Sequence, residues 1–257
     1  MTLSGVRLSE TFSLPTVLVT YVALLFALSV HEASHATMAY YLGDDTAKRM
    51  GRMTLNPIAH MDLLGTLILP LLGMLTGWRV LGWAKPVPVD PRNLTRHMRA
   101  RVGMAAVAAA GPLSNLLQSL IFIPILAILI RNLPGAVEAE RMKIFQAAMF
   151  LPVDAFTGGS LSNLQVFGLT LLGRLVIINV ALALFNLLPV GPLDGSNIIR
   201  GFLPVEWLSK YDRAQPAISI ALLVMFLFGF IGIILGPLFF LAETFYLNPT
   251  ARFFLGV

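Results

Sequence analysis

The chain has 257 residues, of which 57% are hydrophobic and 12% are charged, and its mean hydropathy is +0.81. Soluble domains average about 45–50% apolar and about 25% charged residues, so this composition excludes an ordinary soluble protein and predicts one that lies in lipid. The net charge of +5 is typical of basic loops on the cytoplasmic side of a membrane, so we expect no nucleic-acid partner. Cysteine is absent, which excludes disulfides and thiolate metal sites and leaves His and carboxylates as metal ligands.

Five apolar segments follow one another along the chain and predict membrane helices, since about 20 helical residues cross the hydrocarbon. They cover residues 14–42, 63–77, 102–130, 164–188 and 215–247. The first segment is much longer than a signal-peptide core, so we expect it to stay in the protein. The last is too long for one untilted helix and is expected to form one kinked helix or two. We therefore predict an all-α polytopic membrane protein, a bundle of about five to six transmembrane or re-entrant helices.

The second apolar segment and the residues after it differ from simple spans. Residues 63–77 are too few for a full span and are interrupted by Gly65, Pro70 and Gly73, which favours a short or re-entrant helix. Residues 78–88 read WRVLGWAKPVP, and their alternating bulky residues with Gly and Pro predict a short membrane-associated β-hairpin or an extended loop. The alternative is an ordinary loop at the membrane interface.

The basic residues are distributed unevenly between the loops. Residues 43–103 contain nine Lys or Arg and four Asp, whereas residues 131–165 contain three residues of each sign. Because cytoplasmic loops carry an excess of Lys and Arg, we expect residues 43–103 on the cytoplasmic side, and the N-terminus and residues 131–165 on the other. The chain then returns to the cytoplasmic face around residues 189–213.

Residues 31–35 read HEASH within the first apolar segment, which matches the pattern H-E-x-x-H. In a helix His31 and His35 lie one turn apart on the same face, so both imidazoles can bind one ion. A catalytic zinc site uses three protein ligands and an open position for water, and Glu32 is placed to accept the proton of that water. The alternative is a group of polar residues at the interfacial end of a helix, but ionisable groups inside an apolar helix are functional candidates by default.

A third metal ligand must come from a carboxylate elsewhere in the chain. Asp62, Asp154 and Asp194 lie nearest to apolar segments, and Asp194 is the best candidate. It follows the residues LLPVGPL and precedes Gly195, so a helix ends near Pro189 and a tight turn presents the carboxylate. The alternative for Asp194 is a simple helix cap or turn aspartate.

Three separated motifs together resemble the site-2 protease family of intramembrane zinc metalloproteases, peptidase family M50. HEASH at 31–35 is similar to the family's zinc-binding helix, and GPLSN at 111–115 resembles its small-residue segment ending in Asn. NLLPVGPLDG at 186–195 resembles its motif Asn-x-x-Pro-x-x-x-x-Asp-Gly. TLNPIAHMDLLGT at 54–66 and GWAKPVPVD at 82–90 are similar to the compact subgroup that has neither a PDZ nor a CBS module.

The resemblance implies a single intramembrane metalloprotease domain over residues 1–257. Its catalytic core would occupy about 14–200, and the C-terminal transmembrane segment or segments about 215–247. The expected location is a multi-pass protein of a bacterial inner (cytoplasmic) membrane with the active site toward the cytoplasm. The expected partners are the lipid bilayer and a transmembrane protein or peptide substrate.

The resemblance also assigns roles to individual residues. One Zn²⁺ per chain would be held by His31, His35 and Asp194, with Glu32 as the general base in hydrolysis of peptide bonds within or near transmembrane segments. Asn115 and Asn186 map to positions whose amides anchor an extended substrate strand or steady the oxyanion. The alternative for both asparagines is a helix–helix hydrogen bond that only packs the bundle.

Two rival functions use the same motif. A membrane-embedded gluzincin resembling the CAAX-processing type would take a downstream glutamate as third ligand, but the candidates lack an apt helical motif: they are Glu138, Glu140, Glu206 and Glu243. A metal-binding transporter or a catalytically inactive scaffold is the second rival. The intact Glu32 argues against a scaffold, and the scarcity of further buried charges argues against a transport path.

Two other histidines are not expected to bind metal. His60 sits beside Asp62 in a predicted turn, where a local hydrogen bond to that carboxylate is the preferred interpretation. His97 lies among four arginines, which repel a metal cation, so it is expected at the surface.

Overall fold

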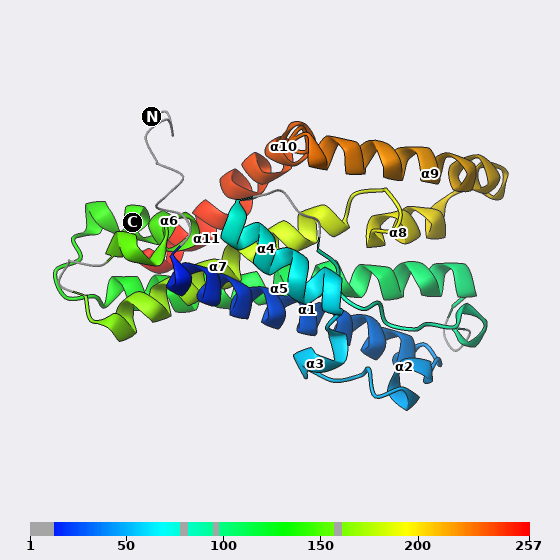
Figure 1. The fold of residues 1–257 in the computed structure, drawn as a ribbon, viewed down its shortest axis with the longest axis horizontal. Coiled ribbons are helices and arrows are strands. Elements are labelled where there is room, and N and C mark those ends of the chain that lie inside the picture. The colour runs from blue at the N-terminus through cyan, green and yellow to red at the C-terminus, as the bar shows by residue number, and fades with distance from the viewer. Residues whose placement is uncertain (1–12, 78–81, 95–97, 157–160) are drawn as a thin grey trace.

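The computed structural model describes residues 13–77, 82–94, 98–156 and 161–257. All regular elements in these residues are helices (Figure 1). The longer ones, in chain order, are α1 (Leu14–Tyr41), α4 (Leu69–Thr76), α5 (Ala100–Arg131), α6 (Glu138–Phe150), α7 (Asn163–Asn186), α8 (Asp194–Phe202), α9 (Val205–Leu227), α10 (Gly232–Ala242) and α11 (Asn248–Leu255). The shorter ones are α2 (Thr46–Arg49), α3 (Pro57–His60), η2 (Leu63–Ile68), η3 (Pro91–Asn93), η4 (Val153–Phe156) and η5 (Glu243–Leu247).

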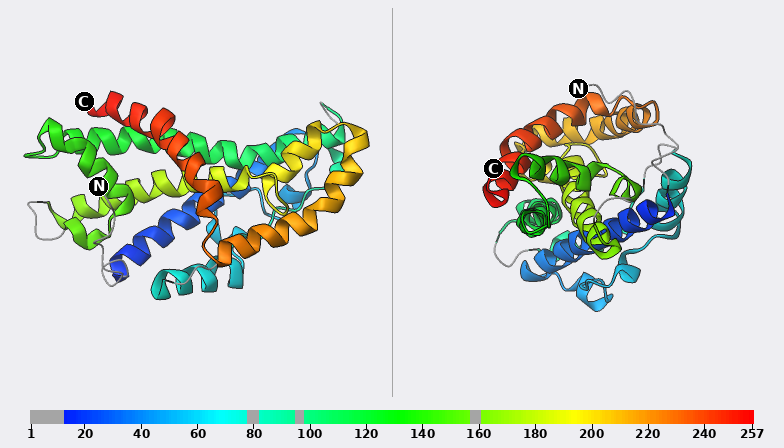
Figure 2. Two further views of the ribbon diagram at one scale, coloured as in Figure 1. Left: turned by 90° about the horizontal axis from the view of Figure 1, so that it is seen from above. Right: turned by 90° about the vertical axis from the view of Figure 1, so that its left-hand side faces the viewer.

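Three long apolar helices, α1, α5 and α7, run side by side along the length of the molecule (Figures 1 and 2). Each is long and apolar enough to cross a membrane. Helix α5 is central, because it packs against α1, α7 and α8. The short apolar helix formed by η2 and α4 lies against α1, in the region where a short or re-entrant segment is predicted.

The C-terminal apolar segment is a bent pair of helices. Helix α9 and the helical stretch Gly232–Leu255 are together long and apolar enough to form one further span. They are bent by 82° at the break between them. Gly229 in the break has a φ of +82°, a left-handed conformation that glycine adopts readily. The described residues therefore hold three candidate spans, or four with the bent pair. With the short helix Leu63–Thr76 the count is five, or six when the two halves of the bent pair are counted separately.

The predicted β-hairpin at residues 78–88 is wrong, because the part of the chain that the structure describes contains no β-strand. Residues 78–81 lie outside that part. Residues 82–90 are extended but form no regular element. The fold class is therefore all-helical without the hairpin.

The extended segment hydrogen-bonds to α3 and η2, which precede it in the chain. Trp83 N–H donates to the carbonyl of Gly65 over 3.0 Å, and Lys85 N–H donates to the carbonyl of His60 over 2.9 Å. Val87 is the next residue that would face the same side, and it makes no backbone hydrogen bond with other described residues, so the pairing ends at Lys85. The segment is thus bonded to the end of α3 and to η2.

The largest hydrophobic core lies toward one end of the bundle, in the C-terminal half of α5. It joins that half to α6, α7 and α11, and its largest fully buried side chains include Phe145, Ile123 and Leu126. The N-terminal half of α5 instead faces α1 and α8. This leaves the polar residues of α1 opposite α5 and the start of α8.

Candidate metal centre

A cavity of about 530 Å³ lies between α1, α5, α7 and α8, and the extended segment 82–89 forms one of its walls. Four of the residues singled out in the sequence, His31, Glu32, His35 and Asp194, line it together. The fold thus brings the middle of α1 and the first residue of α8 to the same space, although they are far apart in the sequence.

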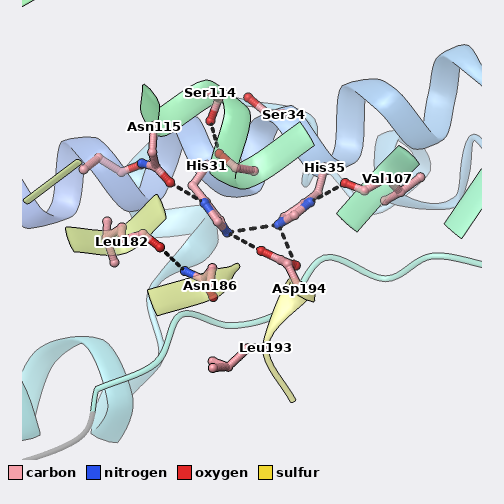
Figure 3. Close-up of polar contacts among 12 residues, drawn as sticks. His31, Ser34, His35, Val107, Ser114, Asn115, Leu182, Asn186, Leu193 and Asp194 are labelled. Atoms are coloured by element: carbon pink, nitrogen blue, oxygen red, sulfur yellow. Dashed lines mark hydrogen bonds and ion pairs between the residues drawn. The ribbon is translucent and has the colours of Figure 1, made fainter. Parts of the chain in front are cut away.

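His31 and His35 lie on one face of α1, as their spacing predicts. Their Nε2 atoms are 3.0 Å apart, and the rings meet edge to face (Figure 3). Glu32 lies next to them, and one ligand atom from each of the three side chains falls within 4.8 Å of the others. All three are buried, which leaves the cavity as their free side.

The other nitrogen of each ring is held by α5. His31 Nδ1 lies 2.6 Å from Asn115 Oδ1, and His35 Nδ1 lies 2.7 Å from the carbonyl of Val107. Both partners are acceptors, so each Nδ1 carries the proton and each Nε2 presents a lone pair. A histidine that ligates a metal through one nitrogen usually donates its other N–H in this way.

Asn115 is itself held by α7. Its Nδ2 donates to Asn179 Oδ1 over 2.7 Å, and Asn179 Nδ2 donates to the carbonyl of Leu175 over 2.8 Å. Both asparagines have 0% of their surface exposed, and Asn115 is not among the residues that line the cavity. The pair therefore connects the backbone of α7 to the ring of His31.

Asp194 approaches the imidazoles from the start of α8. Its Oδ2 lies 3.2 Å from His31 Nε2, and its Oδ1 lies 3.4 Å from His35 Nε2 (Figure 3). The turn before α8 is tight: a Cβ at Gly195 would lie 2.3 Å from the carbonyl oxygens of Leu187 and Leu188. Glycine at this position therefore lets the chain reverse sharply after α7 and bring the carboxylate inward.

The loop before Asp194 is tied to α9 by polar contacts. Gln215 Oε1 accepts from the N–H of Gly191 over 2.7 Å, and Ser219 Oγ donates to the carbonyl of the same residue. Tyr211 Oη donates to the carbonyl of Pro189 over 3.2 Å. These contacts attach α9, which buries none of its own residues, to the turn that presents Asp194.

The converging atoms fit a zinc ion. The two Nε2 atoms lie 3.0 Å apart, and the carboxylate oxygens of Asp194 lie 3.2 Å and 3.4 Å from them. Oδ2 of Asp194 is buried without an aligned hydrogen-bond donor. Ligand atoms at about 2.1 Å around a tetrahedral zinc are separated by about 3.4 Å. Acceptors this close repel one another unless a cation lies between them, so His31, His35 and Asp194 are suited to hold one.

A glycine on α5 makes room for the two rings. A Cβ at Gly111 would lie 2.5 Å from ring atoms of both His31 and His35. Only glycine allows α5 to approach so closely. The sequence contains the signal for this role, because Gly111 opens the GPLSN segment, but its contact with the imidazoles is visible only in the fold.

Of the remaining candidate residues, Asn186 lies at the cavity and the alternative aspartates do not. Asn186 lines the cavity, and its Nδ2 donates to the carbonyl of Leu182. The alternative third ligands do not line it: Asp62 caps η2 by accepting from the N–H groups of Leu64 and Gly65, and Asp154 lies in η4. Sequence reasoning missed Asn179 and the carbonyl of Val107, whose positions depend on helix packing.

Neither of the other two histidines adds to the site. His60 Nε2 hydrogen-bonds to the carbonyl of Thr54 over 2.8 Å, so the predicted bond to Asp62 is wrong. His97 lies outside the described residues. The four downstream glutamates of the gluzincin alternative do not appear among the described residues that line the cavity.

Comparison with known proteins gives the chain a family. Residues 19–232 match Peptidase family M50. The chain is 34% identical over 217 residues, 84% of its own length and 84% of the relative's, to "Putative zinc metalloprotease YwhC" of Bacillus subtilis (strain 168). It is 29% identical over 182 residues, 71% of its length and 56% of the relative's, to "Putative zinc metalloprotease Rip2" of Mycolicibacterium smegmatis (strain ATCC 700084 / mc(2)155). A search of solved structures gave no match. The chain belongs to peptidase family M50, and its relatives are named as zinc metalloproteases.

Proposed function

We propose that this protein is a site-2 protease-like intramembrane endopeptidase that hydrolyses peptide bonds within or near the transmembrane segments of membrane proteins. One observation carries the proposal: His31, His35 and Asp194 converge beside Glu32 inside a cavity, and three of these residues lie on an apolar helix long enough to span a membrane. A hydrolytic centre on such a helix is placed to act on substrates that share the bilayer.

The residues of the site divide the chemistry between them. His31, His35 and Asp194 would hold a zinc ion, and this ion would supply a Lewis acid for water and for the scissile carbonyl. Glu32 accepts the proton of the attacking water and delivers it to the leaving amine. Asn186, whose amide lines the cavity, steadies the substrate strand or the developing oxyanion. Asn115 acts through His31, because its contacts are with that ring and with Asn179.

The extended segment offers backbone groups to a substrate. Trp83 directs its N–H group toward η2 and Lys85 directs its N–H group toward the end of α3, and in an extended chain the residue between them faces the opposite side. Ala84 lies between them, lines the cavity, and makes no backbone hydrogen bond with other described residues. A substrate must leave its helical conformation before attack, and the open edge at Ala84 replaces some of the hydrogen bonds it loses.

Substituting Ala84→Pro tests the role of this edge. Proline removes the N–H that faces the cavity, so cleavage of a transmembrane peptide should fall while zinc content stays that of the wild type. Ala84→Ser keeps the backbone and serves as the matched control. Unchanged cleavage by Ala84→Pro contradicts a substrate strand at this position.

The gluzincin alternative is not supported by the geometry. The carboxylate that lies beside both imidazoles belongs to Asp194. This residue is the first of α8 and follows a tight turn, whereas a gluzincin uses a glutamate within a helix. Asp194→Ala should therefore lower zinc affinity strongly. Zinc affinity unaffected by Asp194→Ala would require another third ligand.

The experiment that tests the proposed function uses the purified protein in proteoliposomes with a synthetic transmembrane peptide. Mass spectrometry of the products maps the bond that is cut. We expect a cut within or at the edge of the apolar segment, and none in a soluble peptide of the same flanking sequence. Cleavage confined to soluble peptides would contradict an intramembrane protease, and zinc uptake into the vesicles without any cleavage would favour the transporter.

A further inference from the structure

A second cavity, distinct from the metal centre, opens next to it. It measures about 330 Å³ and lies between α1, α4, α7, α9 and the extended segment. Its lining is apolar, with the indole of Trp83 as the one side chain that carries a hydrogen-bonding group. Its walls include Leu24 and Leu28 of α1, Met74 of α4 and Phe226 of α9.

The two cavities share a wall. Leu28, Gly82, Trp83 and Leu182 line both the apolar cavity and the cavity of the metal centre. Trp83 is fixed at this boundary, because its ring lies so close to Gly65 that a Cβ there would meet it at 2.4 Å. Ala84, whose open backbone edge faces the metal centre, follows directly. The apolar cavity therefore adjoins the space in which the substrate strand is proposed to lie.

The distance along α1 from Glu32 to the apolar cavity equals the length of a few residues of extended chain. Leu24, Leu28 and Glu32 follow one another at intervals of four residues and lie on one face of the helix. At about 1.5 Å per helical residue, Leu28 lies about 6 Å and Leu24 about 12 Å along the axis from Glu32. An extended strand advances about 3.3 Å per residue, so these distances correspond to about two to four residues.

We propose that this cavity is a specificity subsite that takes one bulky apolar side chain of the substrate, of the Leu, Phe or Met class, about two to four residues from the scissile bond. The proposal rests on the proposed protease function and names a substrate preference for it. Its volume of about 330 Å³ leaves room for such a side chain, and its apolar lining suits one. The shared wall and the neighbouring open edge at Ala84 identify a substrate side chain as the occupant.

A positional scan of the substrate tests the subsite. In a transmembrane peptide with a mapped cleavage site, each flanking position is changed in turn to Phe, Leu, Ala and Asp, and kcat/KM is measured. We expect one position, two to four residues from the cut, at which Phe or Leu exceeds Ala by about ten- to hundredfold. No preference at any of these positions overturns the proposal.

A cavity-filling variant links that preference to the cavity. Leu24→Trp places a larger side chain in it and should remove most of the preference for Phe over Ala, with the Ala peptide still cleaved. The matched control is Leu18→Trp on the same helix, at a position that is 52% exposed and does not line the cavity, and it should keep the wild-type preference. An undiminished preference in Leu24→Trp overturns the proposal.

Photocrosslinking provides a measurement that does not depend on turnover. Glu32→Gln protein is mixed with the intact peptide carrying photoreactive leucine at the preferred position. We expect crosslinks to Leu24, Met74 or Phe226, and crosslinks elsewhere overturn the subsite. If a photoreactive phospholipid labels these residues and the peptide does not displace it, the cavity holds lipid and the proposal fails. Failure of the protease function itself is recognised separately, because wild-type protein then cleaves no peptide of the scan.

Discussion

Each imidazole of the site is fixed by the hydrogen bond on its outer nitrogen. His31 is held by a side-chain amide that is itself held by Asn179, whereas His35 is held directly by the backbone carbonyl of Val107. The ring of His31 therefore depends on two replaceable side chains, and the ring of His35 on none. This difference makes the support of His31 accessible to mutation.

Asn179→Leu should weaken zinc binding without touching a ligand. The substitution removes the acceptor of Asn115 Nδ2, so the amide that orients His31 loses its support. Changes of this kind cost about 10- to 100-fold in metal affinity. Thr170→Val, also fully buried in α7, removes only a hydroxyl bonded to its own helix and should leave zinc affinity unchanged. Competition with a chelator measures both, and equal affinities for the two variants would contradict the support role.

Gly111→Ala should abolish stoichiometric zinc binding. The added methyl group would lie 2.5 Å from both imidazoles, so the rings or helix α5 must move apart. Gly168→Ala is the matched control, because its Cβ would meet only one atom of Leu129, at 3.9 Å. Zinc content of the purified proteins decides the comparison. Full zinc occupancy in Gly111→Ala would show that α5 is not constrained by the metal centre.

The local part of the site could be predicted from the sequence, and the distant part only in outline. His31, Glu32 and His35 lie within one turn of helix, so their common face follows from helical geometry. The convergence with Asp194 required the resemblance to a family, because a turn aspartate has many roles. The partners of Asn115 lie on other helices, and no local pattern fixes them.

At the scale of elements, Asp44 connects the extended segment to the end of α1. Its buried carboxylate accepts from the N–H groups of Thr46 and Asp90 and from the side chain of Asn93. Burial of the carboxylate opposes its ionisation, but these hydrogen bonds outweigh that effect and lower the pKa of Asp44 below its ordinary value of 3.8. The residues that follow the cavity wall are thereby held to the helix that carries the histidines.

Asp44→Ala should loosen this connection. We expect the free energy of unfolding to fall by about 3 kcal/mol, because hydrogen bonds to a charged group are lost. Since the folded-state pKa is lowered, the stability contributed by Asp44 is complete at neutral pH and is lost as the pH falls below 3.8 and through the folded pKa. Thermal unfolding of wild type and variant between pH 3 and 7 measures it. Equal stabilities at neutral pH would contradict this role.

The elements were predicted well where length and apolar character decide. The segments at 14–42, 102–130 and 164–188 correspond to α1, α5 and α7. The prediction of a β-hairpin was wrong for a physical reason. Alternating bulky residues predict an extended chain, but they do not determine which segment it hydrogen-bonds to. Here the partners are the end of α3 and η2, and the described segment 82–90 forms no regular strand.

At the scale of the whole molecule, the loops divide between its two ends. Helix α2 lies toward one end and α6 at the other (Figure 1). The excess of basic residues in 43–103 leads us to propose that α2 and α3 face the cytoplasm. The metal centre lies in the half of α1 that is nearer to this side.

The orientation can be tested directly because the chain has no cysteine of its own. Met50→Cys and Glu140→Cys place single thiols at exposed positions near opposite ends. In intact spheroplasts, an impermeant maleimide should label Glu140→Cys, and it should label Met50→Cys only after the membrane is broken. The reverse pattern would contradict the proposed orientation.

Glu32 is the residue on which the proposed zinc-dependent hydrolysis depends most, because it acts as the base. The most direct measurement is zinc content together with cleavage of a transmembrane peptide by wild type and Glu32→Gln. The account predicts that Glu32→Gln keeps its zinc, since the proposed ligands are unchanged, and loses cleavage by at least about 100-fold, as expected for removal of a general base. Cleavage that persists in Glu32→Gln would contradict the central claim.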